Sequence, residues 1–148
     1  MKFRLELTIN KPRVDVWKVF DNPDNMSKWQ HSLTKFELVN GTQGQPGAIS
    51  KLTYEERGRE FSLIEKVTYR DEPNRFDGVY ENEFTDNPVR NTFIEQGEKA
   101  TLWVVDTEFK FKTFTMKWLG PLLKKNFVRR TQRDMERFKE LAESQQEV

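Results

Sequence analysis

The chain has 148 residues, a length typical of one domain with one sizeable core. Its 25 Lys and Arg against 24 Asp and Glu give a net charge of +1, which argues against a protein dedicated to nucleic acid or to a charged membrane surface. Cysteine is absent, which excludes disulfides and zinc–thiolate sites and is consistent with a cytoplasmic protein. We expect no export signal, and no apolar run approaches the roughly 18 residues of a membrane span.

The first expected elements are a strand and two short helices. Residues 3–9 alternate between apolar and charged or polar side chains, which indicates a half-buried strand. Asn10 is expected to cap a helix whose apolar positions fall within residues 14–20. The sequence Asn22-Pro23-Asp24 breaks that helix, and a second one is expected from Asp24 to about Trp29.

The middle of the chain reads as strands separated by turns. Strands are expected at residues 33–39, 49–56, 61–69, 76–84, 89–96 and 101–112. A glycine-rich loop spans 40–47, Arg57-Gly58-Arg59 marks a tight hairpin, and Asp86-Asn87-Pro88 marks a turn. Successive hairpins predict an antiparallel meander of about six strands, which the first strand extends to about seven.

The last expected element is a long amphipathic helix from Leu119 to Glu143, with Pro121 in its first turn. At about 1.5 Å per residue it would span more than 30 Å. Its inward side on a helical wheel holds Leu119, Leu123, Phe127, Phe138, Leu141 and Ala142. We expect residues 1–143 to form a single domain and residues 144–148 a flexible tail.

These elements predict an α+β fold. A curled antiparallel sheet of about seven strands grips the long C-terminal helix, and the two short helices follow the first strand. A concave sheet and a helix leave a cavity between them unless side chains fill the space.

This order of elements resembles the START-like helix-grip (SRPBCC) superfamily, and within it the polyketide cyclase/dehydrase and lipid-transport branch. The residues that carry the likeness are Ile9-Asn10-Lys11-Pro12 through Trp17, Asn22-Pro23 through Trp29, and Leu119-Gly120-Pro121. They mark structural joints rather than chemistry. The resemblance therefore implies an apolar pocket between sheet and helix, and it supplies no catalytic motif.

Inward-facing side chains of the strands and of the last helix are the candidate ligand-binding residues. They are Tyr54, Leu63, Tyr80, Asn82, Phe93, Trp103, Val105, Thr107, Phe127, Thr131 and Phe138. The alternative is a filled core, since apolar stripes are most often core. Against a filled core, Asn82, Thr107 and Thr131 share the inward register, and a buried polar group without a partner costs about 1–3 kcal/mol. Asp134 falls within the same arc, but we expect it to turn aside and pair with Arg130 or Arg137.

Two residues are weak candidates for acid–base catalysis. His31 is the only histidine and lies near one end of the expected cavity, although a surface histidine at a helix end is the simpler interpretation. Glu65 is at alternate positions of the same expected strand with Leu63 and Val67, so its side chain should point inward with theirs. Burial there would raise its pKa. A β-bulge nearby would reverse that direction. With one histidine and no cysteine, we expect no metal site and no cofactor.

The leading interpretation is binding of a small hydrophobic or aromatic ligand, lipid or polyketide-like, between sheet and helix. A cofactor-independent cyclase/dehydratase-type enzyme using His31 or Glu65 is the second, and it follows from the resemblance. The third is an interaction module using the basic face of the last helix, from Lys124 to Arg137, which could contact phosphates or anionic lipid. Glutamates interleave on that helix, so a solvated face is its simplest interpretation, and we expect no nucleic-acid partner.

Overall fold

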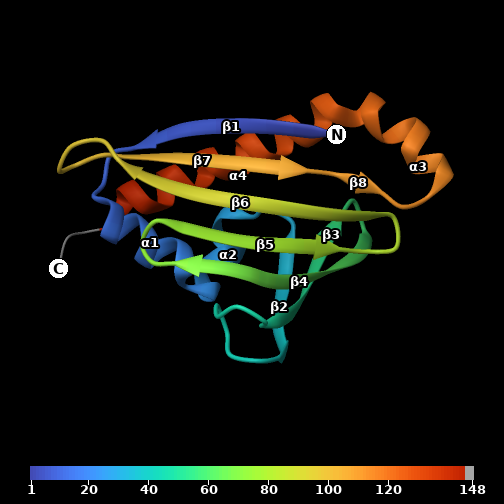
Figure 1. Ribbon diagram of the computed structural model, residues 1–148, viewed down its shortest axis with the longest axis horizontal. Coiled ribbons are helices and arrows are strands. Elements are labelled where there is room, and N and C mark those ends of the chain that lie inside the picture. The colour runs from blue at the N-terminus through green and yellow to red at the C-terminus, as the bar shows by residue number, and fades with distance from the viewer. Residues whose placement is uncertain (146–148) are drawn as a thin grey trace.

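The computed structural model describes residues 1–145, and its elements follow the expected order (Figure 1). The N-terminal part comprises β1 (Lys2–Ile9), α1 (Arg13–Asp21), the 3-10 helix η1 (Pro23–Asn25) and α2 (Met26–Trp29). The strands that follow are β2 (Leu33–Asn40), β3 (Ile49–Glu56), β4 (Arg59–Asp71), β5 (Arg75–Glu81), β6 (Thr85–Glu95), β7 (Thr101–Glu108) and β8 (Lys110–Phe111). The chain ends with α3 (Phe114–Leu119), the 3-10 helix η2 (Gly120–Leu123) and α4 (Lys124–Ser144).

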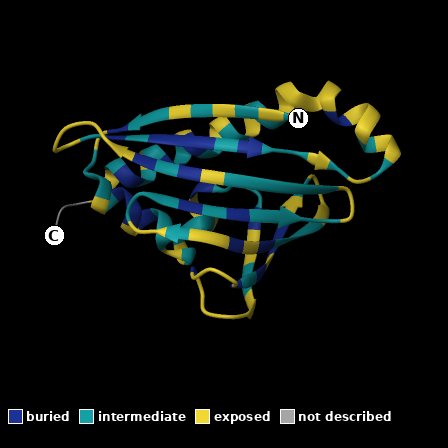
Figure 2. Ribbon diagram, viewed as in Figure 1, coloured by how far each residue is buried: buried dark blue, intermediate teal, exposed yellow. Residues whose placement is uncertain are grey.

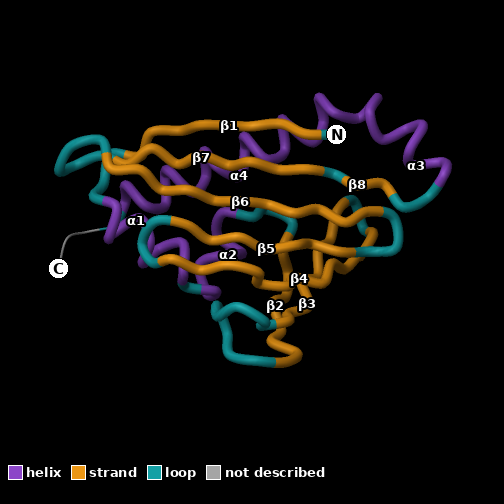
Figure 3. Tube along the Cα trace, viewed as in Figure 1, coloured by secondary structure: helices purple, strands orange, loops and turns teal. Residues whose placement is uncertain are grey.

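All strands join one antiparallel sheet in the order β1-β7-β6-β5-β4-β3-β2, and the short β8 pairs with β6. Hairpins connect β2 through β7, as the order of elements predicted. The structure adds that β1 pairs with β7 at one edge of the sheet. The sheet is open rather than closed, with β1 and β2 at its two edges (Figure 3). The helix-grip fold is confirmed.

The core lies between the sheet and α4, with α1 and α2 packed against that helix. Its centre is aromatic. The ring of Phe138 on α4 is fully buried and lies 4.9 Å from Trp103 on β7 and 5.4 Å from Trp29 on α2, measured between centroids. Phe20 from α1 lies 5.1 Å from Phe93 on β6. Figure 2 shows β7 as the most continuously buried strand of the sheet.

The last helix begins later than expected, and this corrects two predictions. Leu119 and Leu123 were expected to point inward, but they are 48% and 39% exposed because the chain is still in α3 and η2 there. Pro121 has no N–H to donate to the carbonyl of Lys117, so one continuous helix cannot run through this point. Gly120 packs against the ring of Phe111, which fixes where the chain changes direction.

The turn between β5 and β6 also lies earlier than expected. The Asn82 side chain accepts hydrogen bonds from the backbone N–H groups of Phe84 and Thr85, each at 2.8 Å, and so stabilises a turn before Asp86. Pro88 is therefore inside β6. On one side of β6, β8 pairs with it only up to Asp86 and β7 pairs with it only from Val89 onward. Pro88 falls between these two pairings, so its missing N–H interrupts no hydrogen-bonded ladder on that side.

Two smaller expectations concern the ends of helices. Asn10 does not cap α1, whose N-cap is Pro12, whereas Asn22 caps η1 by accepting from the N–H of Asp24. The flexible tail was expected to begin at residue 144, but Ser144 is the last residue of α4. The rest of that prediction, residues 146–148, lies outside the described residues.

Candidate ligand-binding site

A cavity of about 200 Å³ lies between the concave face of the sheet, α2 and α4. Its walls are mainly apolar and aromatic, because the inward positions of β3, β4, β5 and β7 carry Tyr, Leu, Phe and Trp side chains. Six of the residues predicted from the sequence line it, namely Tyr54, Leu63, Tyr80, Trp103, Val105 and Thr131. The period-two pattern of the strands places the first five of these side chains on a common interior surface, and Thr131 comes from α4.

The other predicted residues lie elsewhere. Phe93 and Phe138 are fully buried in the aromatic core next to the cavity. Thr107 is buried at the far end of β7, where its hydroxyl accepts a hydrogen bond from the Asn87 amide at 2.7 Å. Phe127 stacks on Phe109, with ring centroids 4.6 Å apart. Asn82 stabilises the β5–β6 turn and is outside the cavity wall.

The structure adds polar wall residues that the sequence argument did not name. Gln30 follows α2 and accepts a hydrogen bond from the Tyr54 hydroxyl at 2.8 Å. Asn91 on β6 accepts one from the indole N–H of Trp103 at 3.1 Å and is itself buried. Asn91 is two residues before Phe93 on β6 and so points to the same face of the sheet. The alternation of side chains along the strand could therefore have identified it. Gln30 lies in a loop and gave no such signal.

Glu65 is buried in the cavity wall, as its parity with Leu63 predicted, with only 6% of its surface exposed. It lies directly opposite Tyr80 in the register between β4 and β5, and the Tyr80 hydroxyl donates a hydrogen bond to its carboxylate. Burial raises the pKa of Glu65 above its ordinary value, and the hydrogen bond from Tyr80 opposes that rise. Burial, together with the nearby Glu65 charge, also raises the pKa of Tyr80 well above its ordinary value. Burial therefore favours the neutral form of both side chains in the cavity wall.

Asp134 on α4 lines both the cavity and a second, basic cleft. The pairing expected with Arg137 is present, with Arg137 Nη1 3.2 Å from Asp134 Oδ1. Burial nevertheless raises the pKa of Asp134 to about 6, and Arg130, Arg137 and the backbone N–H of His31 only partly oppose this. Asp134 therefore has a pKa of about 6, well above that of an ordinary aspartate.

The basic cleft has a volume of about 470 Å³ and shares Gln30, Tyr54 and Asp134 with the cavity. Its further lining residues are His31, Ser32, Glu56, Arg57, Asn126, Arg129, Arg130, Arg133 and Arg137. The guanidinium of Arg130 lies 5.8 Å from the centre of the Tyr54 ring and pairs with Glu56 at 2.8 Å. His31 is exposed in this cleft and does not line the apolar cavity.

Within residues 1–145, no group of three or more His, Cys, Asp or Glu side chains is arranged to hold a metal ion. No helix in the same range is both long and apolar enough to cross a membrane.

The open curled sheet, the short helices after β1 and the long helix across the concave side define a START-like helix-grip protein with an internal cavity. More specifically, the chain belongs to the family described as polyketide cyclase/dehydrase and lipid transport, whose sequence model matches residues 1–143. A search of curated protein sequences finds no match.

Similar solved structures share the fold at low sequence identity. The ZhuI aromatase/cyclase from Streptomyces sp. R1128 is 13% identical, with a TM-score of 0.81, and the alignment covers 97% of this chain and 93% of that one. A START superfamily protein from Mycobacterium smegmatis is 15% identical, with a TM-score of 0.79 and coverage of 96% and 97%. Norcoclaurine synthase from Thalictrum flavum, in complex with dopamine and hydroxybenzaldehyde, is 14% identical, with a TM-score of 0.72 and coverage of 100% and 89%.

Proposed function

We propose that the protein binds a small hydrophobic or aromatic molecule, lipid or polyketide-like, in the cavity between the sheet and α4. The observation that carries the proposal is an internal space with aromatic walls and a few inward polar groups. This is the usual character of a small-molecule site, in which apolar burial drives binding and polar groups fix orientation. The family description and the aromatic compounds bound to the norcoclaurine synthase structure support the same class of ligand.

The size of the cavity favours a compact ligand. Its volume of about 200 Å³ is below the range of about 300–1,000 Å³ common for ligand sites. One or two rings fit such a space better than a long acyl chain does. A longer molecule would have to extend beyond the cavity, and the neighbouring basic cleft, which shares Gln30, Tyr54 and Asp134 with it, is the space that we expect it to enter.

The cavity wall contains a hydrogen-bond donor that has no partner within residues 1–145 and that such a ligand could use. The indole N–H of Trp29, a cavity-lining residue, is buried and has no hydrogen-bond partner among the described residues. A buried donor without a partner is costly, so a ligand oxygen that accepts from it would gain affinity and orientation. Asn91, in contrast, is already held by Trp103. We therefore expect a ligand with at least one oxygen acceptor on its ring.

Binding is tested by titrating a panel of lipids, flavonoids and aromatic acids while following tryptophan fluorescence. The assay uses the Trp118→Phe variant, because Trp118 is 71% exposed and Trp29 and Trp103 lie in the cavity wall. Saturable quenching is expected. Val105→Phe should fill the cavity and abolish the quenching. Val39→Phe is the control, because Val39 is 62% exposed, and it should leave the quenching unchanged.

Leu63→Phe is a second cavity-filling variant in case Val105→Phe does not fold. Retained binding in a folded cavity-filling variant would refute the proposed site. A panel that gives no response with any compound, together with a protein that purifies free of bound small molecules, would count against ligand binding altogether.

The buried Glu65 favours a second candidate, a cofactor-independent dehydratase or cyclase. Of the two acid–base candidates, Glu65 fronts the cavity and His31 does not. In such a reaction protonated Glu65 would donate its proton to a substrate hydroxyl, which leaves as water. The resulting carboxylate would then take a proton from the neighbouring carbon as the double bond forms, which regenerates the acid.

The enzymatic candidate is tested with a compound that the binding assay has identified. Glu65→Gln keeps the size of the side chain but cannot release a proton, so turnover should fall by about 100-fold or more while binding remains. His31→Gln is the matched control, because that residue lies outside the cavity. Equal turnover by the wild type and Glu65→Gln would remove Glu65 from any mechanism.

A further inference from the structure

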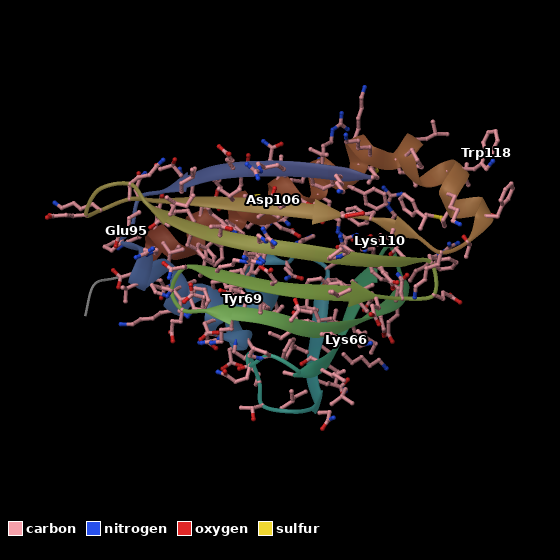
Figure 4. The ribbon with its side chains drawn as sticks, in the orientation of Figure 1. Lys66, Tyr69, Glu95, Asp106, Lys110 and Trp118 are labelled. Atoms are coloured by element: carbon pink, nitrogen blue, oxygen red, sulfur yellow. The ribbon has the colours of Figure 1, made fainter. Side chains whose placement is uncertain are left out.

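The segment between β8 and α4 exposes a cluster of large apolar side chains. We name this cluster the apolar cap. It consists of Phe114, Trp118, Leu119, Leu122 and Leu123, which are 79%, 71%, 48%, 77% and 39% exposed. In Figure 1 α3 projects from one end of the molecule, and Figure 4 shows Trp118 pointing away from the rest of the chain. Large apolar surfaces of this kind usually mark an interaction site.

The same segment concentrates positive charge. Residues 109–133 contain eight basic side chains and no acidic one, although the whole chain has 25 basic and 24 acidic residues. Among the described residues, Lys110, Lys117, Lys124 and Lys125 have no ion-pair partner, and each is exposed. The near-neutral composition of the chain thus hides a basic segment, in which these four lysines flank or interleave with the residues of the apolar cap along the sequence.

Specific contacts hold this end in place. The Thr113 side chain caps α3 by accepting a hydrogen bond from the Met116 N–H at 3.1 Å. Gly120 is buried against the Phe111 ring, with no room for a side chain. The cap residues are therefore presented outward by a structured backbone.

We propose that the apolar cap and its lysines dock on an anionic lipid bilayer. Aromatic and leucine side chains would enter the headgroup region while the surrounding lysines contact lipid phosphates, a combination that suits membrane surfaces. A bilayer is favoured over a protein partner because the cap projects outward, and a fluid surface can accommodate it without a matching pocket. This inference depends on neither the cavity nor its ligand.

The experiment compares vesicles of phosphatidylcholine alone with vesicles of equal parts phosphatidylcholine and phosphatidylserine. Binding is measured by cosedimentation and by the emission of Trp118. The other three tryptophans are at most 8% exposed, so a blue shift on adding vesicles reports Trp118 leaving water. Binding and a blue shift with the anionic vesicles, both weakened by added salt, are expected.

Matched variants separate the apolar and the charged contributions. Phe114→Ala combined with Leu122→Ala should lower the partition coefficient by roughly tenfold or more, because both side chains would lose burial in the lipid. Val14→Ala combined with Val39→Ala, at residues exposed on other elements, should have no effect. Each pair leaves Trp118 in place as the reporter.

For the charged contribution, Lys117→Glu should weaken binding by roughly tenfold, since it replaces attraction by repulsion. Lys18→Glu, the same charge change on the exposed side of α1, is its control. Absence of binding to the anionic vesicles, or equal binding to both kinds of vesicle, would overturn the proposal. A cap-dependent dimer with no vesicle binding would also overturn it and would assign the cap to self-association.

Discussion

Asp134→Asn should stabilise the protein at neutral pH and much less in acid. Asp134 has a pKa of about 6 in the folded chain against an ordinary value of 3.8, chiefly because it is buried. A carboxyl group with a raised pKa binds more protons folded than unfolded, so its contribution to stability falls as pH rises from about 4 to about 6. At about 1.36 kcal/mol per pKa unit, the ionised carboxylate costs about 3 kcal/mol at pH of about 7.5 and about 0.5 kcal/mol at pH of about 4.

Asparagine keeps the shape of the side chain and an acceptor oxygen for Arg137 but cannot ionise. Because the Asp134 side chain retains 23% exposure, we expect a gain of about 1–3 kcal/mol at the higher pH and a small one at the lower. Urea unfolding at both pH values measures the two differences, and carbon NMR of the Asp134 carboxyl group measures its pKa directly. An equal gain at both pH values, or a carboxyl pKa below about 4, would refute the reasoning.

Three further predictions concern stability. Phe138→Ala should cost about 3–5 kcal/mol in urea unfolding, because a fully buried ring at the centre of the aromatic core is removed. Arg70→Met should lower the free energy of unfolding by about 2 kcal/mol, because Asp21 at the cavity wall would lose its two hydrogen bonds of 2.6 and 2.7 Å. A cost near zero would contradict that role of Arg70. Gly120→Ala should cost about 1–3 kcal/mol by clashing with the Phe111 ring, and adding Phe111→Leu should recover part of that loss in a double-mutant cycle.

The proposed functions depend on different parts of the C-terminal segment. The cavity and the basic cleft meet beside Asp134, whereas the apolar cap precedes the first turn of the helix. Cavity-filling variants such as Val105→Phe should therefore leave vesicle binding unchanged, and cap variants should leave ligand quenching unchanged. Each proposal can consequently fail without affecting the other.

Local patterns predicted most of the strands and the direction of their side chains. Alternation placed Tyr54, Leu63, Tyr80, Trp103 and Val105 on one face of the sheet, and they line one cavity. The direction of a strand side chain depends only on the period of two along the backbone, which any stretch of sequence displays.

Where local signals competed, the sequence was less informative. Asp86-Asn87-Pro88 has turn-forming residues, yet the turn is stabilised by Asn82, and Pro88 is accommodated within β6 at a point where neither β7 nor β8 pairs with it. Similarly, the apolar pattern from Leu119 onward suggested a buried helix face, but the surface that would cover Leu119 does not extend that far. Both outcomes depend on which distant strand or helix is adjacent.

The sequence by itself thus determined the order of the elements, which residues of each strand point inward, and the inward direction of Glu65. Only the tertiary structure decided that Phe93 and Phe138 lie behind the cavity wall while Trp103 and Glu65 line the cavity, and that Leu119 and Leu123 are exposed to water. The physical reason is that local side-chain direction is set by neighbouring residues along the chain, whereas cavities and exposed surfaces are set by how far separate elements approach one another.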